Sequence, residues 1–290
     1  MRKLNGPTRL IKQRYDICVF DKNNGEPILY KRSNYRYWYA DPFLAEENGK
    51  AFCFVELMDN HVKHGEIARL SMDGKLTKVV SEPYHLSWPY IFKYGDKWLM
   101  MPESSGNKDL RLYIADSLEG EWSYYKTLLE GVTVCDSVIF ELDGGHYLLT
   151  YDFSNVDEYK AVFYHFDISS LMVGEFINYI PDRRKVLRPA GKAFCDKDTL
   201  ILPTQKGTDS YGEDVIFNEI VRNADGTLSV NKINYSVAYP AKIVARYDHK
   251  HTYNAEGDKA VLDFSKLVFS PMQIIDGLPC TFKRLFRRGE

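Results

Sequence analysis

Short apolar runs that end on a polar residue recur along this chain about every fifty residues. The copies end at or near Glu56, Glu103, Asp152, Gln205 and Asp263, which lie 47, 49, 53 and 58 residues apart. Periods of this length indicate a repeat architecture, and repeats built from strands favour a β-propeller. Because there are five copies, we predict an all-β fold, a five-bladed β-propeller that forms a single domain.

Glycine-containing turns divide the chain into the same units. Examples are ENGK at 47–50, YGDK at 94–97 and LDGGH at 142–146, where glycine supplies the positive φ that tight turns need. The predicted blades cover about 37–80, 84–129, 134–178, 188–233 and the remainder up to about 269. Helical periodicity is scarce, and the candidates for short helices are 167–173 and part of 265–286.

The N-terminal segment contains a predicted hairpin outside the repeat, at 15–31, with an Asn-Gly turn. We expect this hairpin to complete the last blade, because closure removes an exposed sheet edge. The predicted division is an N-terminal arm and closing hairpin at 1–36, the propeller at 37–270 and a basic tail at 271–290. The tail mixes aromatic, aliphatic and basic residues, which fits peripheral contact with a membrane or a partner protein as well as a solvated tail.

Composition narrows the partners and the compartment. The formal net charge is −2, so no overall field attracts nucleic acid. The five cysteines form no CxxC pair, and no apolar segment follows the basic N-terminus, so we expect reduced thiols in a cytoplasmic protein. Phe, Trp and Tyr make up 14% of the chain, and such residues both fill β cores and stack on sugars.

Carboxylates provide the candidate catalytic residues. Asp41 and Asp136 lead the first and third repeats at equivalent positions, since each is followed eight residues later by a turn glycine, Gly49 or Gly144. Inner strands line a propeller axis, so two such acids can converge on one pocket, as glycosidic-bond chemistry requires. Both residues also suit a capping role at strand starts. Glu103 is the third candidate, although the polar residues that close the strands also fit a structural ring.

The fourth and fifth repeats carry other polar residues. Arg188 stands where an acid is expected, and its guanidinium suits a carboxylate or phosphate. His251 suits a sugar hydroxyl, acid–base catalysis, an axial ion or a place in the core. The predicted substrate-binding residues are Arg188, Gln205, Tyr211, His251, Asn254, His85 and Trp88. No zinc-ligand cluster, P-loop or dinucleotide motif is present, so we predict no cofactor; an axial calcium ion is compatible with the fold but is not indicated.

Taken in order, these motifs resemble the propeller domain at the N-terminus of plant glucosamine inositolphosphorylceramide transferases and of bacterial proteins from surface-polysaccharide loci. The resemblance spans roughly residues 37–264. It is carried by ADPF at 40–43, EPYHLS at 82–87, PES at 102–104, Asp136, RPAG at 188–191, Gln205, Tyr211-Gly212 and HTYN at 251–254. It implies a role in surface polysaccharide or glycoconjugate metabolism.

More distantly, the chain is similar to the five-bladed glycoside hydrolases of the arabinanase and β-xylosidase type. That resemblance implies a general base at Asp41 and, at Asp136, a carboxylate that tunes pKa and orients the sugar. Those enzymes place their general acid where this chain has RPAG at 188–191. The acid would then come from Glu103, Glu213 or His251, and Arg188 would suit an anionic group on the substrate.

Two functional hypotheses follow. The first is an inverting glycosyltransferase- or glycosidase-like enzyme that makes or breaks a glycosidic bond at the propeller mouth. The second is a sugar-binding or scaffold propeller without catalysis, which the missing blade-four acid supports. The expected partner in both is a carbohydrate or glycoconjugate. Asp41, Asp136 and a third titratable group that face one water-filled pocket within about 10 Å favour the enzyme, whereas a buried Asp41 that is fully bonded to backbone amides favours the binding or structural role.

Overall fold

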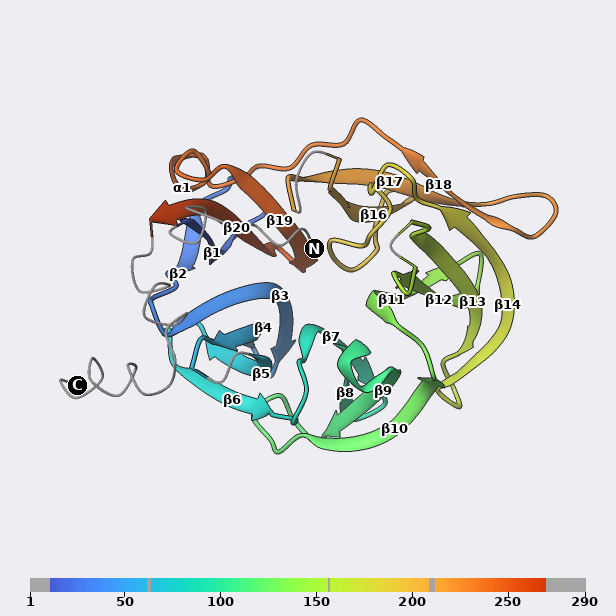
Figure 1. Cartoon of the computed structure of the whole chain (residues 1–290), viewed down its shortest axis with the longest axis horizontal. Coiled ribbons are helices and arrows are strands. Elements are labelled where there is room, and N and C mark those ends of the chain that lie inside the picture. Colours follow the sequence, from blue (N-terminus) through green and yellow to red (C-terminus); the bar gives the residue numbers. More distant parts are fainter. Residues whose placement is uncertain (1–10, 62–63, 156, 209–211, 270–290) are drawn as a thin grey trace.

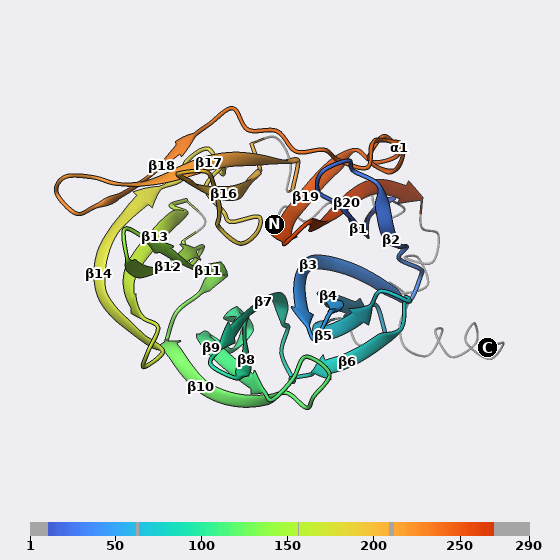
Figure 2. The same cartoon turned by 180° about the vertical axis from the view of Figure 1, so that it is seen from behind.

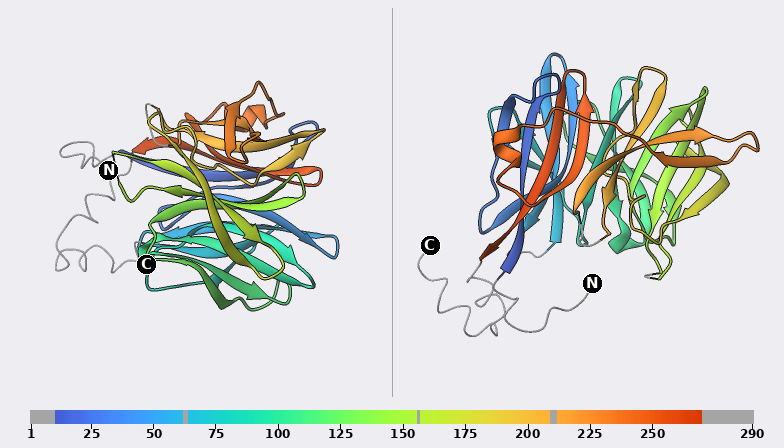
Figure 3. Two further views of the ribbon diagram at one scale, coloured as in Figure 1. Left: turned by 90° about the vertical axis from the view of Figure 1, so that its right-hand side faces the viewer. Right: turned by 90° about the horizontal axis from the view of Figure 1, so that it is seen from above.

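The computed structural model describes residues 11–269 except 62–63, 156 and 209–211. Twenty strands in this part of the chain form five four-stranded antiparallel sheets around a central axis, which confirms the predicted five-bladed all-β fold (Figure 1). The view from behind shows the same ring of sheets (Figure 2). Side views show the strands running roughly along the axis (Figure 3).

Blades one to four each use four consecutive strands. Blade one contains β3 (Tyr37–Glu47), β4 (Lys50–Asp59), β5 (His64–Ser71) and β6 (Leu76–Val80). Blade two contains β7 (Ser87–Tyr94), β8 (Lys97–Ser104), β9 (Asp109–Ala115) and β10 (Ser123–Glu130). Blade three contains β11 (Val134–Leu142), β12 (Gly145–Asp152), β13 (Lys160–Asp167) and β14 (Met172–Pro181). Blade four contains β15 (Phe194–Asp196), β16 (Thr199–Lys206), β17 (Asp214–Arg222) and β18 (Leu228–Lys232).

Blade five joins the two ends of the described chain. Its strand order is β19 (His249–Glu256), β20 (Lys259–Phe269), β1 (Ile11–Asp21) and β2 (Pro27–Lys31). The pairing of β1 with β20 is continuous from Ile11↔Phe269 to Asp21↔Lys259. The N-terminal hairpin therefore supplies the two outer strands of the last sheet, and the ring closes through backbone hydrogen bonds.

Short helices play little part in the described residues. They are η2 (Ser105–Asn107), a single 3₁₀ turn, and α1 (Ala241–Val244), which the sequence did not predict. The helix expected at 167–173 is wrong, because Asp167 accepts hydrogen bonds from the backbone N–H groups of Ser169 and Ser170 at 2.9 and 3.3 Å and forms a turn. The described part of 265–286 belongs to β20, and the rest lies outside the described residues.

Apolar side chains fill the spaces between adjacent blades. The largest cluster joins blades one to four and contains Phe43, Trp88 and Phe163, all fully buried. Smaller clusters join blade five to blades one and four. Within the described residues, no helix has the length and apolar character needed to cross a membrane. This packing leaves the inner strands β3, β7, β11 and β19 facing the axis (Figure 1).

Candidate active site

The inner strands of the first three blades share an irregularity at one position. Pairing shifts between Ala40 and Phe43 in β3, between Ser87 and Tyr90 in β7, and between Cys135 and Val138 in β11. Inside these bulges lie Asp41, Trp88 and Asp136, with φ values of 49°, 50° and 48°. Positive φ is uncommon outside glycine, and such bulges and strained residues concentrate at functional sites.

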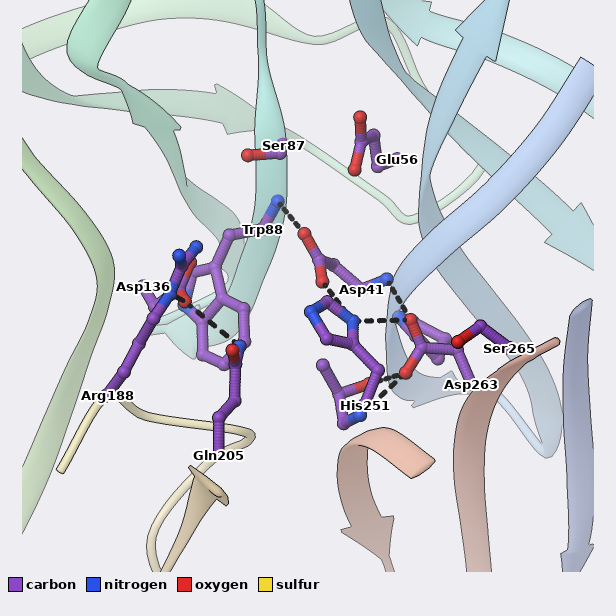
Figure 4. A network of polar contacts seen from close by, with 12 residues as sticks. Asp41, Glu56, Ser87, Trp88, Asp136, Arg188, Gln205, His251, Asp263 and Ser265 are labelled. Atoms are coloured by element: carbon purple, nitrogen blue, oxygen red, sulfur yellow. Dashed lines mark hydrogen bonds and ion pairs between the residues drawn. The ribbon is translucent and has the colours of Figure 1, made fainter. Parts of the chain in front are cut away.

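We call the polar residues gathered at these bulges the axial cluster. They come from all five blades (Figure 4). Its members are Asp41, Glu56, Asp136, Arg188, Gln205, His251 and Asp263, together with Glu103, whose carboxylate lies within 4.8 Å of Asp136. The cluster thus combines five acidic groups with one arginine and one histidine, in a region where all of them are buried or half-buried.

Asp41 lies at the junction of blades one, two and five and is only 6% exposed. Its Oδ2 accepts a hydrogen bond from the Trp88 backbone N–H at 3.3 Å, and its Oδ1 lies 3.4 Å from His251 Nδ1. Burial raises the pKa of Asp41 to about 7; the charge of His251 opposes this shift, while Asp136 and Asp263 add to it. Asp41 therefore accepts from one backbone amide and changes charge near neutral pH.

His251 and Asp263 form a buried pair beside Asp41. His251 Nδ1 lies 2.9 Å from Asp263 Oδ2. Burial alone would lower the pKa of His251, but the Asp263 carboxylate raises it overall. Burial alone would likewise raise the pKa of Asp263, yet the His251 charge and hydrogen bonds from His251 and Thr252 lower it. The pair therefore favours an imidazolium and a carboxylate.

Asp136 is engaged by two residues of blade four. Its Oδ2 accepts from Arg188 Nε, and Gln205 Nε2 lies 3.4 Å from the same oxygen. The side chain of Asp136 is 1% exposed and that of Arg188 is 25% exposed. Arg188 thus neutralises the blade-three acid, rather than facing the solvent as a vacant anion site. The other oxygen of Asp136, Oδ1, has no hydrogen-bond partner among the described residues.

Two glutamates occupy matching places on the second strands of blades one and two. Glu56 pairs in register with Ala40, and Glu103 pairs with Ser87. Burial raises the pKa of Glu103 to about 7, with a further rise from Asp136 and a reduction from Arg188. Burial, followed by the charge of Asp41, holds the pKa of Glu56 well above its usual range. Both carboxyl groups can therefore hold a proton at a pH where an ordinary glutamate is ionised, Glu56 near Asp41 and Glu103 near Asp136.

The expected ring of strand-closing residues does not extend to Asp152. In blade three the residue in register with Cys135 is Tyr151, so Asp152 is displaced by one position along β12. Neighbouring residues of a strand point to opposite faces. Asp152 instead accepts hydrogen bonds from Ser154 and lies 3.5 Å from Lys160. It stands apart from the axial cluster.

The predicted substrate-binding residues fall into different environments. Arg188, Gln205 and His251 belong to the axial cluster. His85 is 39% exposed, accepts from the Gly65 backbone N–H at 2.9 Å through Nδ1, and places Nε2 3.5 Å from Glu56. His85 therefore lies beside Glu56 with much of its side chain in contact with solvent.

Trp88 and Asn254 serve packing between blades. Trp88 is fully buried, and its indole N–H donates to the Ser137 carbonyl at 3.0 Å. The Asn254 amide donates to the Pro42 carbonyl at 2.8 Å and accepts from the Lys192 N–H at 2.7 Å. These two side chains thus join blades rather than present a surface to a sugar. Tyr211 lies outside the described residues.

Asp263 and Glu56 are members of the cluster that sequence reasoning did not select. Both were visible as polar residues in the apolar strands of the repeat. The place of each residue in the cluster depends on which inner-strand residue it faces. The bulges in the inner strands set this pairing, and no sequence pattern marks their positions. Glu213, a candidate acid from the resemblance, forms an ion pair with Lys206 at the start of blade four's third strand.

Two groups of three potential metal ligands occur in the described residues, each with ligand atoms within 4.8 Å of one another: Asp41, His251 and Asp263, and Glu103, Cys135 and Asp136. In the first, the two Asp263 oxygens already accept hydrogen bonds from His251 and Thr252. In the second, burial holds the pKa of the Cys135 thiol well above its usual range. Ligand atoms of the first group are already engaged in hydrogen bonds, and the thiol of the second group is protonated. We therefore assign no ion to either group.

Comparison with solved structures places the fold among five-bladed glycoside hydrolases. A thermostable family-43 glycoside hydrolase matches with a TM-score of 0.58 at 10% identity, covering 86% of this chain and 91% of that protein. An exo-β-1,3-galactanase from Phanerochaete chrysosporium matches with a TM-score of 0.55 at 12% identity, covering 88% and 63% of the two chains. At these identities the likeness concerns the fold alone.

Sequence relatives come from plants. Glucosamine inositolphosphorylceramide transferase 1 from Oryza sativa subsp. indica is 30% identical over 188 residues, which are 61% of this chain and 25% of the rice protein. The Arabidopsis thaliana protein of the same name is 28% identical over 215 residues, 70% of this chain and 27% of that protein. The match therefore spans about a quarter of the plant proteins. The family model for the N-terminal part of glucosamine inositolphosphorylceramide transferase 1 matches residues 21–263, so the chain belongs to that family.

Proposed function

We propose that this protein makes or breaks a glycosidic bond at the axial cluster, with Asp41 as general base and Glu103 as general acid. The observation that carries the proposal is the pair of carboxyl groups from blades one and two whose pKa is raised to about 7. Asp136 adds to the rise in both pKa values, and Arg188 opposes it. Carboxyls tuned toward neutrality are what acid–base catalysis at physiological pH needs.

The proposed reaction is an inverting displacement at the anomeric carbon. Asp41 takes the proton of an attacking water or acceptor hydroxyl as the new carbon–oxygen bond forms. The bond to the leaving group breaks in the same step, and Glu103 donates its proton to the departing oxygen. Asp136, held by Arg188 and Gln205, orients a sugar hydroxyl through its unpartnered Oδ1. The acid expected in blade four is thereby replaced by one from blade two.

The family supports a glycoconjugate substrate. The plant relatives carry the name glucosamine inositolphosphorylceramide transferase 1. We therefore place the reaction in glycoconjugate or surface-polysaccharide biosynthesis, with glycosyl transfer ahead of hydrolysis. We also place it in the cytoplasm, a proposal supported by the free cysteines Cys18, Cys53, Cys135 and Cys195.

A sugar-binding module without catalysis is the second candidate. It is favoured by the depth of Asp41, which is 6% exposed, and by the arginine in the blade-four position. In that case the cluster would recognise hydroxyl groups, and turnover would come from another protein or domain. The two candidates differ in whether a substrate is consumed.

The test is a panel of nucleotide sugars with acceptors, together with aryl glycosides and oligosaccharides. Wild type is compared with Asp41→Asn and Glu103→Gln, and with Asp152→Asn as a control acid outside the cluster. We expect turnover to fall at least about a hundredfold in the first two variants and to persist in the control. Turnover that is unchanged in Asp41→Asn would remove the proposed base, and binding without turnover in wild type would establish the second candidate.

A further inference from the structure

The Asp263 carboxylate is a meeting point of blades one and five. Its Oδ1 accepts from the Thr252 backbone N–H at 2.6 Å and from Thr252 Oγ1 at 2.7 Å. Its Oδ2 accepts from His251 Nδ1 at 2.9 Å and from the Asp41 backbone N–H at 3.1 Å. The residue has no exposed surface, so each oxygen is satisfied by two protein donors without solvent.

These contacts act on both halves of Asp41. The Asp41 backbone has φ of 49°, a conformation that persists in a non-glycine residue only when its surroundings enforce it. The hydrogen bond from its N–H to Asp263 is one such restraint. Its carboxylate, in turn, lies 3.4 Å from the same His251 Nδ1 that faces Asp263 (Figure 4). Asp263 thus restrains the Asp41 backbone through one hydrogen bond and orients the His251 imidazole beside the Asp41 carboxylate through another.

We propose that Asp263 is a positioning residue for the proposed general base: it clamps the strained backbone of Asp41 and holds His251 as an oriented imidazolium beside the Asp41 carboxylate. This inference rests on the proposed function. It adds a residue from the fifth blade to a reaction centre otherwise built from blades one to four. His251 then acts as a counter-ion for Asp41 rather than as the general acid.

The charges facing His251 agree with this arrangement. Asp263 of β20 and Asp41 of β3 favour its cationic form, whereas Arg188 opposes it. The Tyr15 ring of β1 packs edge-on against the His251 imidazole, with ring centroids 5.2 Å apart. Burial raises the pKa of the Tyr15 hydroxyl, so this neighbour stays neutral. Since His251 influences Asp41 more strongly than Asp263 does, loss of the imidazolium should raise the pKa of Asp41.

The experiment replaces Asp263 with Asn and follows the His251 ring by NMR in histidine-labelled protein. His251→Gln identifies the His251 signal among the seven histidines. In wild type we expect the His251 pKa above the ordinary value of about 6.5, and in Asp263→Asn a fall below it. We also expect kcat/KM to drop by about a hundredfold and its acid limb to move to higher pH.

Asp16→Asn is the matched control, because Asp16 is also fully buried in blade five but contacts Ser33 and Tyr247 instead of the cluster. It should lower stability while leaving the His251 pKa and the pH profile unchanged. If Asp263→Asn does not fold, the NMR titration of His251 in wild type remains the test, because it reads the charge that Asp263 is inferred to hold. A wild-type His251 pKa at or below 6.5, or variants that change stability alone, would overturn the inference. If wild type shows no turnover, the proposed function fails, whereas the NMR arm still decides whether Asp263 holds His251 charged.

Discussion

Asp41 and Asp136 occupy the same bulge position in blades one and three, with nearly equal φ of 49° and 48°, yet their cationic partners differ. Asp41 lies beside His251, and Asp136 lies beside Arg188. An arginine stays charged across the accessible pH range, whereas a histidine titrates near neutrality. Two equivalent acids therefore have different neighbours: Asp136 faces a permanent cation, and Asp41 faces a cation whose charge depends on pH.

The raised pKa of Asp41 predicts a pH dependence of stability. The folded-state value of about 7 lies above the unfolded value near 3.9, so this contribution is complete at low pH and is lost as pH rises through about 7. We expect the stability of Asp41→Asn relative to wild type to improve between pH 5 and pH 8, by on the order of 2 kcal/mol. Urea unfolding at the two pH values measures this. A difference that stays constant or declines would show that Asp41 is ionised throughout.

The Asp136–Arg188 ion pair predicts a large cost when only one partner is removed. Arg188→Met leaves a carboxylate that is 1% exposed without its cation, and we expect a loss of about 3 kcal/mol. Asp136→Asn combined with Arg188→Met should be more stable than Arg188→Met alone. Urea denaturation of wild type, the two single variants Arg188→Met and Asp136→Asn, and the double variant gives the coupling energy. A cost of Arg188→Met below about 0.5 kcal/mol, as for an exposed pair, would contradict a buried interaction.

The sequence sufficed for the fold because periodic features encode it. Apolar strands and glycine turns placed blade one at 37–80, and β3 to β6 run from Tyr37 to Val80. The equivalence of Asp41 and Asp136 was also readable, since both precede a turn glycine by eight residues. Repeated local chemistry survives in a single sequence because each blade must solve the same packing problem.

Contacts between blades were not readable in the same way. Arg188 was expected to hold a substrate anion, but its neighbour in space is Asp136, 52 positions away along the chain. In the sequence Asp263 is visible only as a polar strand residue, although in the structure it accepts a hydrogen bond from the Asp41 N–H between blades five and one. Such contacts depend on which residue each bulge turns toward the axis, and that register has no local signature.

The RPAG motif predicts a steric requirement at Gly191. The Ala190 carbonyl accepts from the Tyr253 N–H at 2.7 Å, so blade four runs directly against β19. A Cβ on Gly191 would lie 1.9 Å from the Tyr253 carbonyl oxygen. We expect Gly191→Ala to cost about 3 kcal/mol or more, because backbone on both sides resists movement. Thermal unfolding compares it with Gly106→Ala, where the nearest atom would be 3.3 Å away; equal effects would refute a specific need for glycine at 191.

Closure of the ring predicts that Asp16 matters for the stability of the whole propeller. Asp16 is fully buried in β1, accepts from the Ser33 backbone N–H at 2.6 Å through Oδ1, and is bonded by Tyr247 through Oδ2. It thereby ties the N-terminal hairpin to the segment that precedes β19. We expect Asp16→Asn to cost about 2 kcal/mol, since an amide cannot accept at both positions and leaves a buried polar group poorly paired.

The loss should appear in one cooperative transition, because blade five contains both ends of the described chain and its opening exposes the neighbouring cores. Trp88, Trp98 and Trp122 lie or pack in blades one and two, far along the chain from Asp16, whereas Trp38 stacks on Tyr15, the neighbour of Asp16, with ring centroids 5.4 Å apart. Urea unfolding is therefore followed by tryptophan fluorescence in a Trp38→Phe background, so that the signal reports blades one and two away from the substitution. The control is Asp225→Asn, an exposed turn residue whose carboxylate accepts from the backbone N–H and hydroxyl of Thr227. An unchanged urea midpoint in Asp16→Asn would show that the stability of the whole propeller does not depend on the N-terminal hairpin.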